Sequence, residues 1–179
     1  KVETLCAQSS FLETSYLLLF GRLPTRQELD RWTSDITHHR RIKFRINDLL
    51  KCLPETGHPM DALQAAVAAL GMFYPGRQVK DAENNYWSAV RLIAKLPTIV
   101  AAWARLRHGN DPIPPRDELE FSDNFLYMLT ERTPHPLWRE IFDDCLILHA
   151  EHTMNASTFT GLVTASTLAD PYTVVASSI

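Results

Sequence analysis

The sequence predicts an all-α protein built from eight or nine helices. Apolar residues recur at helical spacing along nearly the whole chain, and no segment alternates apolar and polar residues long enough to form a strand. Glycine makes up 6 of 179 residues, about half its usual share of ~7%, which disfavours a turn-rich all-β domain. With 45% hydrophobic residues, the chain can bury a core, and its length is typical of one domain.

Two helices are expected near the start of the chain. The first runs from about Ser10 to Phe20, and Gly21 is a suitable residue to end it. The residues Thr25-Arg26-Gln27-Glu28 form a capping-box sequence, which predicts the beginning of the second helix. This second helix places three apolar residues on one side: Leu29, Trp32 and Ile36.

The next two helices are separated by a turn at positions 54–57. One helix is expected around Phe44–Leu53, ending before Pro54. The other covers Met60–Leu70, and Pro59 favours its start. The five alanines of this helix leave little side-chain bulk, so it can pack closely against a partner helix. They are Ala62, Ala65, Ala66, Ala68 and Ala69.

A long helical segment occupies the middle of the chain. Residues Asp81–His108 form one helix or two helices joined at Pro97, because a proline removes a backbone hydrogen bond and kinks or breaks a helix. The connector Asp111–Pro115 is rigid, since it contains three prolines. The helical pattern then resumes at Leu119–Leu129.

Three further helical segments complete the chain. They are Pro136–His152, then Asn155–Leu168, which is rich in Ser, Thr and Ala, and finally a helix that begins at Asp170. The Asp-Pro pair at its beginning is a helix-start signal. The first of these segments presents an apolar stripe formed by Leu137, Ile141, Cys145, Leu148 and His152. The last helix is interrupted at Ile179, and the chain does not begin with methionine. We therefore expect a piece of a longer protein.

Charge and composition exclude several classes of protein. The net charge of −3 gives no general attraction to nucleic acid or to an anionic membrane. No apolar run approaches the ~20 residues that a membrane span requires. The cysteines are odd in number and form no Cys-x-x-Cys pair, which favours a reducing cytoplasm over a disulfide framework or a thiolate metal site. They are Cys6, Cys52 and Cys145.

The densest cluster of functional side chains is His149-Ala150-Glu151-His152. Its two histidines lie three residues apart on one helix face and could bind a metal together, but a zinc site needs a third ligand that the sequence does not indicate. Two other interpretations stay open. One is a packed or hydrogen-bonded pair at a helix end, and the other is a histidine that binds an anion.

Cys145 precedes His149 by four residues, a spacing at which a histidine could lower the pKa of the thiol. Both residues lie within or beside the apolar stripe, where a cysteine is usually buried and unreactive. We therefore expect Cys145 to contribute packing and not to act as a nucleophile.

The one strongly basic stretch is His38–Arg45. It could contact a phosphate or an acidic partner. However, it joins two expected helices, and Phe44 is its only aromatic ring apart from histidine. A solvated helix end is therefore the better interpretation, and a nucleic-acid surface is disfavoured.

Four segments carry recognisable motifs in a fixed order. They are Ser10–Thr25 with its G-x-L-P-T end, His58–Leu63 with HPMD, Pro115–Leu126 with PR-x-x-L and NFL, and His149–Thr160, which is similar to HAEHE-x-NASTFT. Together these segments resemble the citrate synthase family in its bacterial form. The last motif is the most specific, and the resemblance covers essentially the whole chain.

The resemblance implies a large helical domain that pairs into a homodimer or a higher homo-oligomer through the helices at Pro59, Asn155 and Asp170. It implies that acetyl-CoA condenses with oxaloacetate and that the citryl thioester is hydrolysed to citrate and CoA. Neither metal nor cofactor is implied, because a carboxylate base, histidines and cations carry the chemistry and acetyl-CoA is a substrate. The cysteine pattern favours the cytoplasm as location, and charge and composition favour neither nucleic acid nor membrane as a partner.

The resemblance assigns oxaloacetate binding to His152 and a supporting role to His149. Two positions depart from the family pattern. Thr153 stands where an acidic residue is usual, and it could change the charge beside the substrate. Gly161, followed by Leu162 in place of the usual Ala-Arg pair, could loosen its helix by about 1 kcal/mol relative to alanine.

The next family motif, GPxHGGAN, carries a catalytic histidine and would begin just beyond Ile179. The second catalytic histidine, the catalytic aspartate and the substrate-binding arginines would lie farther on. We therefore expect residues 1–179 to be part of the large domain, without the small domain or the C-terminal part. Such a chain contains no catalytic residue and is expected to be inactive alone, whereas the intact protein would be an acyltransferase.

Two alternatives to a citrate synthase remain at this point. A 2-methylcitrate synthase, which uses propionyl-CoA, shares the visible motifs. A non-catalytic helical module that serves only to oligomerise would also contain small-residue helices without the catalytic half.

Overall fold

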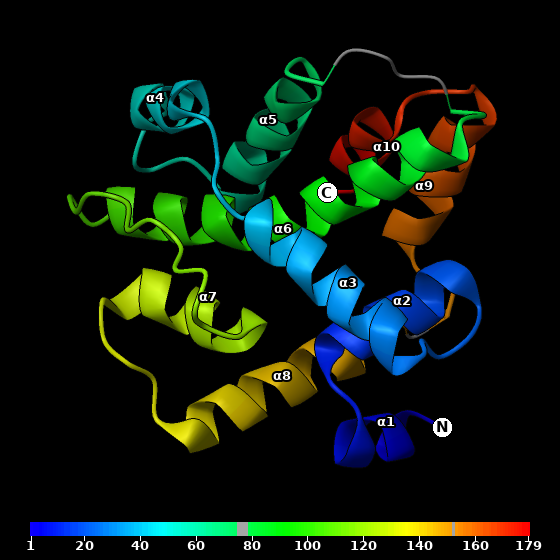
Figure 1. The fold of residues 1–179 in the computed structure, drawn as a ribbon. Coiled ribbons are helices and arrows are strands. Elements are labelled where there is room, and N and C mark those ends of the chain that lie inside the picture. Colours follow the sequence, from blue (N-terminus) through cyan, green and yellow to red (C-terminus); the bar gives the residue numbers. More distant parts are fainter. Residues whose placement is uncertain (75–78, 152) are drawn as a thin grey trace.

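The structure is a computed structural model that describes residues 1–74, 79–151 and 153–179. Regular secondary structure in these residues is entirely α-helical, which confirms the predicted fold class (Figure 1). The described part contains ten helices, against the eight or nine expected. They are α1 Val2–Gln8, α2 Phe11–Phe20, α3 Arg26–His38, α4 Phe44–Cys52, α5 Pro59–Gly71, α6 Ala82–Leu106, α7 Phe121–Thr130, α8 Pro136–Ala150, α9 Ala156–Ser166 and α10 Pro171–Ser178.

The additional helix is α1, which the sequence pattern did not indicate. It has seven residues, none of them buried, and its N-cap residue makes no side-chain capping bond. A helix that buries nothing needs no apolar periodicity, so the signal on which the prediction depended is missing.

The predicted start and stop signals act as expected. The Ser10 hydroxyl accepts the Glu13 N–H at the start of α2, and Gly21 ends that helix with φ of +73°. At the start of α3, both bonds of the capping box between Thr25 and Glu28 are present. Local chemistry therefore fixes these helix boundaries.

The central helix α6 runs unbroken through Pro97, which decides between the two alternatives for this segment. The proline removes the hydrogen bond to the Ile93 carbonyl. Tertiary packing compensates for this loss, because α6 contacts α3, α4, α5, α7 and α10. Figure 1 shows α6 crossing the molecule, with α4 and α5 on one side and α7 on the other.

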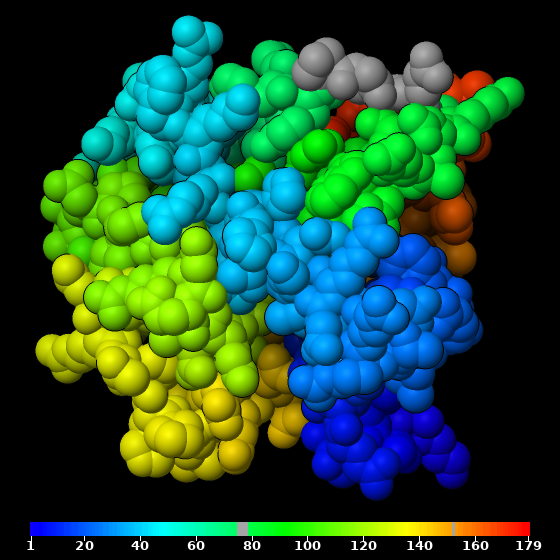
Figure 2. Space-filling model, viewed as in Figure 1, coloured from blue at the N-terminus to red at the C-terminus, as the bar shows by residue number. Residues whose placement is uncertain are grey.

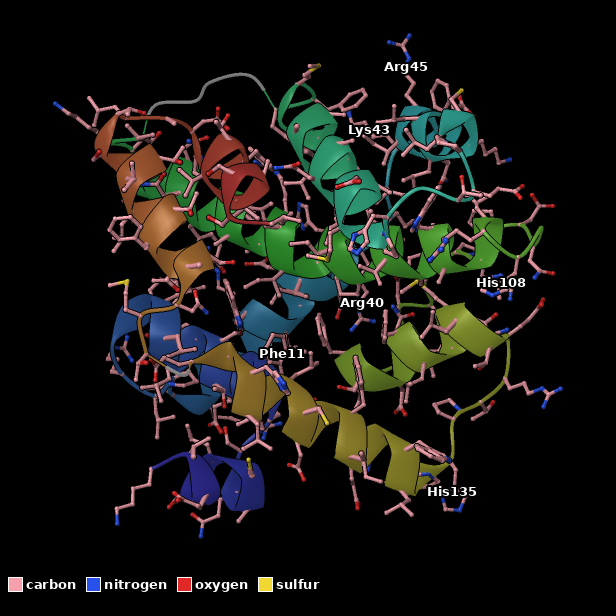
Figure 3. The ribbon with its side chains drawn as sticks, turned by 180° about the vertical axis from the view of Figure 1, so that it is seen from behind. Phe11, Arg40, Lys43, Arg45, His108 and His135 are labelled. Carbon is pink, nitrogen blue, oxygen red and sulfur yellow. The ribbon has the colours of Figure 1, made fainter. Side chains whose placement is uncertain are left out.

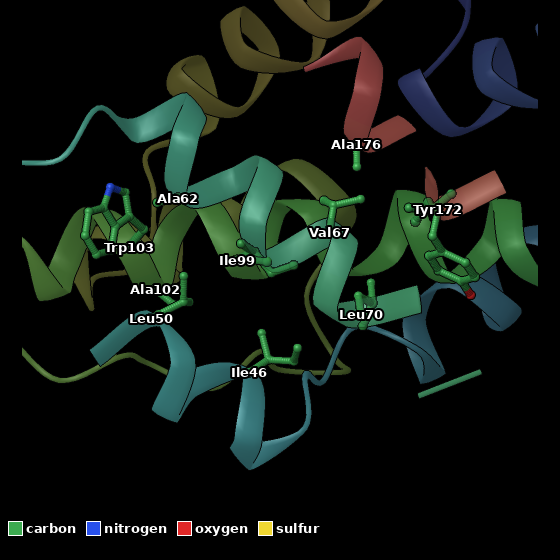
Figure 4. Packing of buried hydrophobic residues seen from close by; sticks show 12 residues of the cluster. Ile46, Leu50, Ala62, Val67, Leu70, Ile99, Ala102, Trp103, Tyr172 and Ala176 are labelled. Carbon is green, nitrogen blue, oxygen red and sulfur yellow. The ribbon is translucent and has the colours of Figure 1, made fainter. Parts of the chain in front are cut away.

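Two apolar clusters lie along α6 and hold the other helices against it. One joins α4, α5, α6 and α10 (Figure 4), and its fully buried members include Leu50, Ala66, Val67 and Leu70. The second joins α2, α3, α6 and α7, with Trp32 at its centre. Burial of Ala66 and Ala62 against α6 and α10 confirms that α5 packs closely through its small residues.

The predicted apolar stripe on α8 is wrong as a packing surface. Leu137, Ile141 and Leu148 are 54%, 44% and 50% exposed, and Cys145 is also exposed. Helix α8 contacts α1, α2 and α7 through a different face, and among its described residues only Ile147 is buried. In the space-filling view α8 and α1 form the lower edge of the molecule (Figure 2). His152, the last member of the stripe, lies outside the described residues.

Gly161 lies where α9 meets α10. A Cβ atom at this position would lie 2.8 Å from the Ser178 Oγ and 3.7 Å from the Val174 Cγ1. The glycine therefore allows close approach of the two helices, a packing role that the sequence pattern did not indicate.

In the described part of the chain, no helix combines the length and hydropathy needed to cross a membrane.

Candidate functional site

The most distinctive sequence motif lies at the turn between α8 and α9. Helix α8 ends at Ala150, and α9 begins at Ala156 with Asn155 as its N-cap. The Asn155 Oδ1 accepts the Thr158 N–H at 2.7 Å, as an asparagine in this position is expected to do. The sequence therefore sets the start of α9 directly after the paired histidines of the motif.

Thr153 has an unusual backbone conformation inside this turn. Its φ of +76° is in the left-handed region, which costs a β-branched residue about 1–3 kcal/mol. The Thr153 N–H donates to Glu151 Oε1 at 2.5 Å. The Glu151 side chain thus satisfies the Thr153 N–H within the turn.

His149 is hydrogen-bonded within its own helix. Its Nδ1 lies 2.6 Å from the Cys145 carbonyl oxygen, which can only accept, so Nδ1 carries the proton. In the neutral ring Nε2 is then an acceptor. The structure thereby favours a hydrogen-bonded histidine at the helix end, one of the interpretations left open for this residue. Its partner His152 lies outside the described residues.

The thiol of Cys145 is exposed, so the expectation that it is buried is wrong. The contact between His149 and Cys145 involves the cysteine carbonyl and the Nδ1 proton. That nitrogen therefore cannot accept the thiol proton. Cys6, Cys52 and Cys145 all carry free thiols.

A cavity of about 270 Å³ adjoins the turn. Its described lining residues include His149, Ala150, Glu151, Thr153, Met154, Asn155 and Thr158. Within the described residues, no group of three or more His, Cys, Asp or Glu side chains is arranged to hold a metal ion. The groups that the turn offers to a ligand are an imidazole, a carboxylate, an amide and hydroxyls.

A larger cavity of about 640 Å³ lies between α1, α2, α3, α7 and α8. Its charged lining includes Arg40 and Arg139, but carboxylates outnumber them. The carboxylates are those of Asp117, Glu118, Glu120, Glu140, Asp143 and Asp144. Six carboxylates against two guanidinium groups disfavour an anionic ligand. None of the described motif residues at the α8–α9 turn lines this cavity, so we place the candidate site at the smaller one.

The basic stretch His38–Arg45 is only partly the solvated helix end that the sequence predicts. Figure 3 shows Arg45 directed away from the molecule and Arg40 inside it. Arg40 is 2% exposed, and its Nη1 donates to the carbonyls of Leu119 at 2.6 Å and Arg116 at 3.1 Å. Burial lowers the pKa of the Arg40 guanidinium, and nearby Asp117 opposes this shift. Arg40 thus ties the end of α3 to the loop before α7.

Lys95 of α6 holds the same segment from the other side. Its Nζ donates to the carbonyls of His39 at 2.5 Å and Arg41 at 2.6 Å, while Thr98 Oγ1 donates to the Arg40 carbonyl. Lys95 is buried. Burial lowers its pKa to about 8, and the positive charges of Arg91 and Lys43 add to the shift.

The lowered pKa of Lys95 predicts a stability that rises in alkaline solution. Below about pH 8 the amine is protonated in both the folded and the unfolded chain. Between about pH 8 and ~10.4, the pKa of an unfolded lysine, the unfolded chain binds the extra proton, so the free energy of unfolding rises with pH. A neutral amine still has two N–H donors for the two carbonyls.

Urea unfolding of the wild type and Lys95→Met at pH 7.5 and pH 10 measures this effect. The stability difference in favour of the wild type should grow by about 2–3 kcal/mol over this range. Other titrating groups cancel in the comparison. A difference that shrinks with pH would contradict the assignment.

The sequence of this chain matches a family model and several curated proteins. The family model described as "Citrate synthase, C-terminal domain" matches residues 1–179. The chain is 56% identical over 179 residues to the citrate synthase of Synechocystis sp., covering 100% of this chain and 45% of that protein. It is 50% identical over 183 residues to the citrate synthase of Acidithiobacillus ferridurans, covering 99% of this chain and 47% of that protein.

Solved structures agree with the sequence comparison. The crystal structure of citrate synthase from Pyrobaculum aerophilum superposes with a TM-score of 0.91 at 39% identity, covering 99% of this chain and 46% of that chain. The structure from Thermotoga maritima gives a TM-score of 0.84 at 30% identity. The chain spans about half the length of the curated relatives that it matches.

Proposed function

The chain belongs to the citrate synthase family, and we propose that the whole protein condenses acetyl-CoA with oxaloacetate and water to form citrate and CoA. The observation that carries this proposal is the family match over the whole chain, including the motif at the α8–α9 turn. The relatives reported above are named citrate synthase, which favours acetyl-CoA over the propionyl-CoA of a 2-methylcitrate synthase.

Residues 1–179 are proposed to be part of the large helical domain. The fold supports this, because its helices superpose on citrate synthase structures of about twice the length. The GPxHGGAN motif, which carries a catalytic histidine in the family, does not occur in this sequence. The chain alone is therefore expected to be inactive.

His152 is proposed to contact oxaloacetate, and His149 to support it. The position of His152 within the family motif supports this role. For His149, the hydrogen bond from Nδ1 to the Cys145 carbonyl fixes the ring and leaves Nε2 as its free acceptor. An acceptor nitrogen cannot donate to a carboxylate, so His149 is proposed to support the site by accepting from a neighbouring donor and not by contacting the dicarboxylate.

The partners are proposed to be the two substrates and further copies of the same protein. Helix α9 supports self-association, because Phe159, Leu162 and Val163 are 61%, 56% and 52% exposed, and exposed apolar patches of this kind mark interaction sites. We propose neither metal nor cofactor. A cytoplasmic location is proposed from the three free thiols.

The test is a thiol-release assay on the full-length protein with acetyl-CoA and oxaloacetate. Release of CoA at an enzyme-like rate is expected, with a higher kcat/KM for acetyl-CoA than for propionyl-CoA. Residues 1–179 alone should release none. Absence of thiol release from the full-length protein would overturn the proposal and favour a non-catalytic module.

A further inference from the structure

A third cavity, of about 310 Å³, lies where α2, α3 and the start of α6 meet. It shares no described lining residue with the cavity at the α8–α9 turn, and its volume suits a small organic molecule. Aromatic side chains dominate its described lining, and we call this space the aromatic cavity. They are Tyr16, Phe20, Tyr86 and Trp87.

The four rings form connected walls and not a single stack. Tyr86 and Trp87 meet nearly at right angles, with centroids 5.2 Å apart. Phe20 links this pair to Tyr16, because its ring centroid lies 4.3 Å from that of Tyr16 and 6.3 Å from that of Tyr86. The face of an aromatic ring is negative, so a cavity walled by several rings attracts a cation.

The protein's own cations already lie over two of these rings. The guanidinium of Arg31 lies over Tyr86 and that of Arg22 over Tyr16, each with its Cζ 5.8 Å from the ring centroid. Arg31 also lines the cavity. Its side chain is largely exposed, and its ion pair with Asp35 is 3.7 Å long. Exposed pairs of this kind contribute little to stability, so a cationic ligand can replace Arg31 over Tyr86.

The hydrogen-bond acceptors of the cavity decide which kind of cation fits. Both carboxylate oxygens of Glu28 accept from Arg22, and Oε2 also accepts the Thr25 N–H. Glu83 is the other carboxylate of the described lining, and its side chain forms no ion pair within the described part of the chain. A primary ammonium has three N–H donors, which one free carboxylate serves poorly. A quaternary ammonium has no N–H and needs only ring faces and a negative charge.

We propose that the aromatic cavity binds a small quaternary ammonium ion of the choline type. The ammonium group lies against the rings of Phe20, Tyr86 and Trp87, where it replaces Arg31, and the Glu83 carboxylate supplies the negative charge. The residues involved are separate from those that line the cavity at the α8–α9 turn, so the inference does not depend on the proposed function.

Isothermal titration calorimetry of the full-length protein with choline chloride tests the proposal. We expect binding with a Kd of about 1 mM, measured against sodium chloride at the same ionic strength. The alcohol 3,3-dimethylbutan-1-ol has the shape of choline without its charge, and it should bind at least about tenfold more weakly. Equal binding of the two compounds would show an apolar pocket without preference for a cation and would overturn the proposal.

Substitutions at the cavity give effects of opposite sign. Trp87→Leu keeps apolar bulk but removes a ring, so choline should bind about tenfold more weakly. Arg31→Ala removes the competing cation over Tyr86, so choline should bind about threefold more tightly. Trp138→Leu is the matched control, because Trp138 is an exposed tryptophan of α8 that does not line the aromatic cavity, and it should leave the affinity unchanged.

The outcomes decide the inference without reference to catalysis. Absence of choline binding by the wild type overturns it, as does weaker binding by Arg31→Ala, which would show that the guanidinium contacts the ligand. If Trp87→Leu does not fold, Phe20→Leu replaces it, since that ring is partly exposed, and an unchanged affinity in this variant contradicts the proposal. Thiol release by the same protein preparation reports on the proposed function, so either proposal can fail while the other stands.

Discussion

Replacing Trp32 with alanine is expected to lower the free energy of unfolding by about 3–5 kcal/mol. The Trp32 side chain is fully buried in the cluster that joins α2, α3, α6 and α7. Its ring meets those of Tyr86, Phe20 and Tyr16 edge-on, with centroids 5.6, 5.9 and 6.0 Å away. Alanine would leave a large cavity among these rings. Urea unfolding followed by circular dichroism measures the loss.

Two control variants separate packing from hydrogen bonding. Trp32→Phe keeps an aromatic ring but loses the indole N–H, which donates to the Ser15 hydroxyl at 3.1 Å, so a smaller loss of about 1–2 kcal/mol is expected. Trp138 is 63% exposed on α8, and Trp138→Ala should change stability by less than ~0.5 kcal/mol. Equal losses in the two alanine variants would show that the Trp32 cluster is not a main source of stability.

The fold was predictable from sequence wherever a boundary depends on local chemistry. Ser10, Gly21 and the capping box at Thr25 act within one helical turn, so their effect does not depend on distant residues. The existence of helix α1 and the exposure of the apolar face of α8 could not be predicted from local chemistry. Whether an apolar stripe is buried depends on which element lies against it, and the described residues of the stripe on α8 stay largely exposed.

The basic stretch illustrates the same limit for charged residues. The sequence places Arg40 at a helix end, where a solvated cation is the simplest expectation. Its burial is set by the carbonyls of Arg116 and Leu119, more than seventy positions farther along the chain. Lys95 is similar, since a single lysine in an apolar helix gives no indication that it binds two loop carbonyls.

The position of the candidate site could be predicted from its sequence motif, but the geometry of the site could not. The sequence indicates the α8–α9 turn through His149–Thr160, and the resemblance treats Thr153 as a change of charge. Its positive φ could not be predicted, because threonine disfavours that conformation and no glycine or asparagine occupies the position. The hydrogen bond from Thr153 to Glu151 becomes evident only from the coordinates.

Asp143→Ala is expected to destabilise the protein by about 2–4 kcal/mol and to loosen the helix that leads to the candidate site. The Asp143 carboxylate joins three helices, because it accepts the Phe11 N–H at the start of α2 at 2.9 Å and the Ser122 hydroxyl of α7 at 2.6 Å. Hydrogen bonds to a charged group contribute about 1.5–3 kcal/mol each. Among the described residues of α8 only Ile147 is buried, so these bonds are a major part of its attachment.

The neighbouring carboxylate gives a matched control for this effect. Asp144 lies one position along α8 and makes neither of these bonds, so Asp144→Ala should cost less than ~1 kcal/mol. Asp143→Asn should fall between the two alanine variants, since its amide oxygen can accept only one of the two bonds that a carboxylate shares between its oxygens. Thermal unfolding of the three variants ranks them directly. If Asp143→Ala and Asp144→Ala unfold at the same temperature, α8 is held by apolar contacts and not by Asp143.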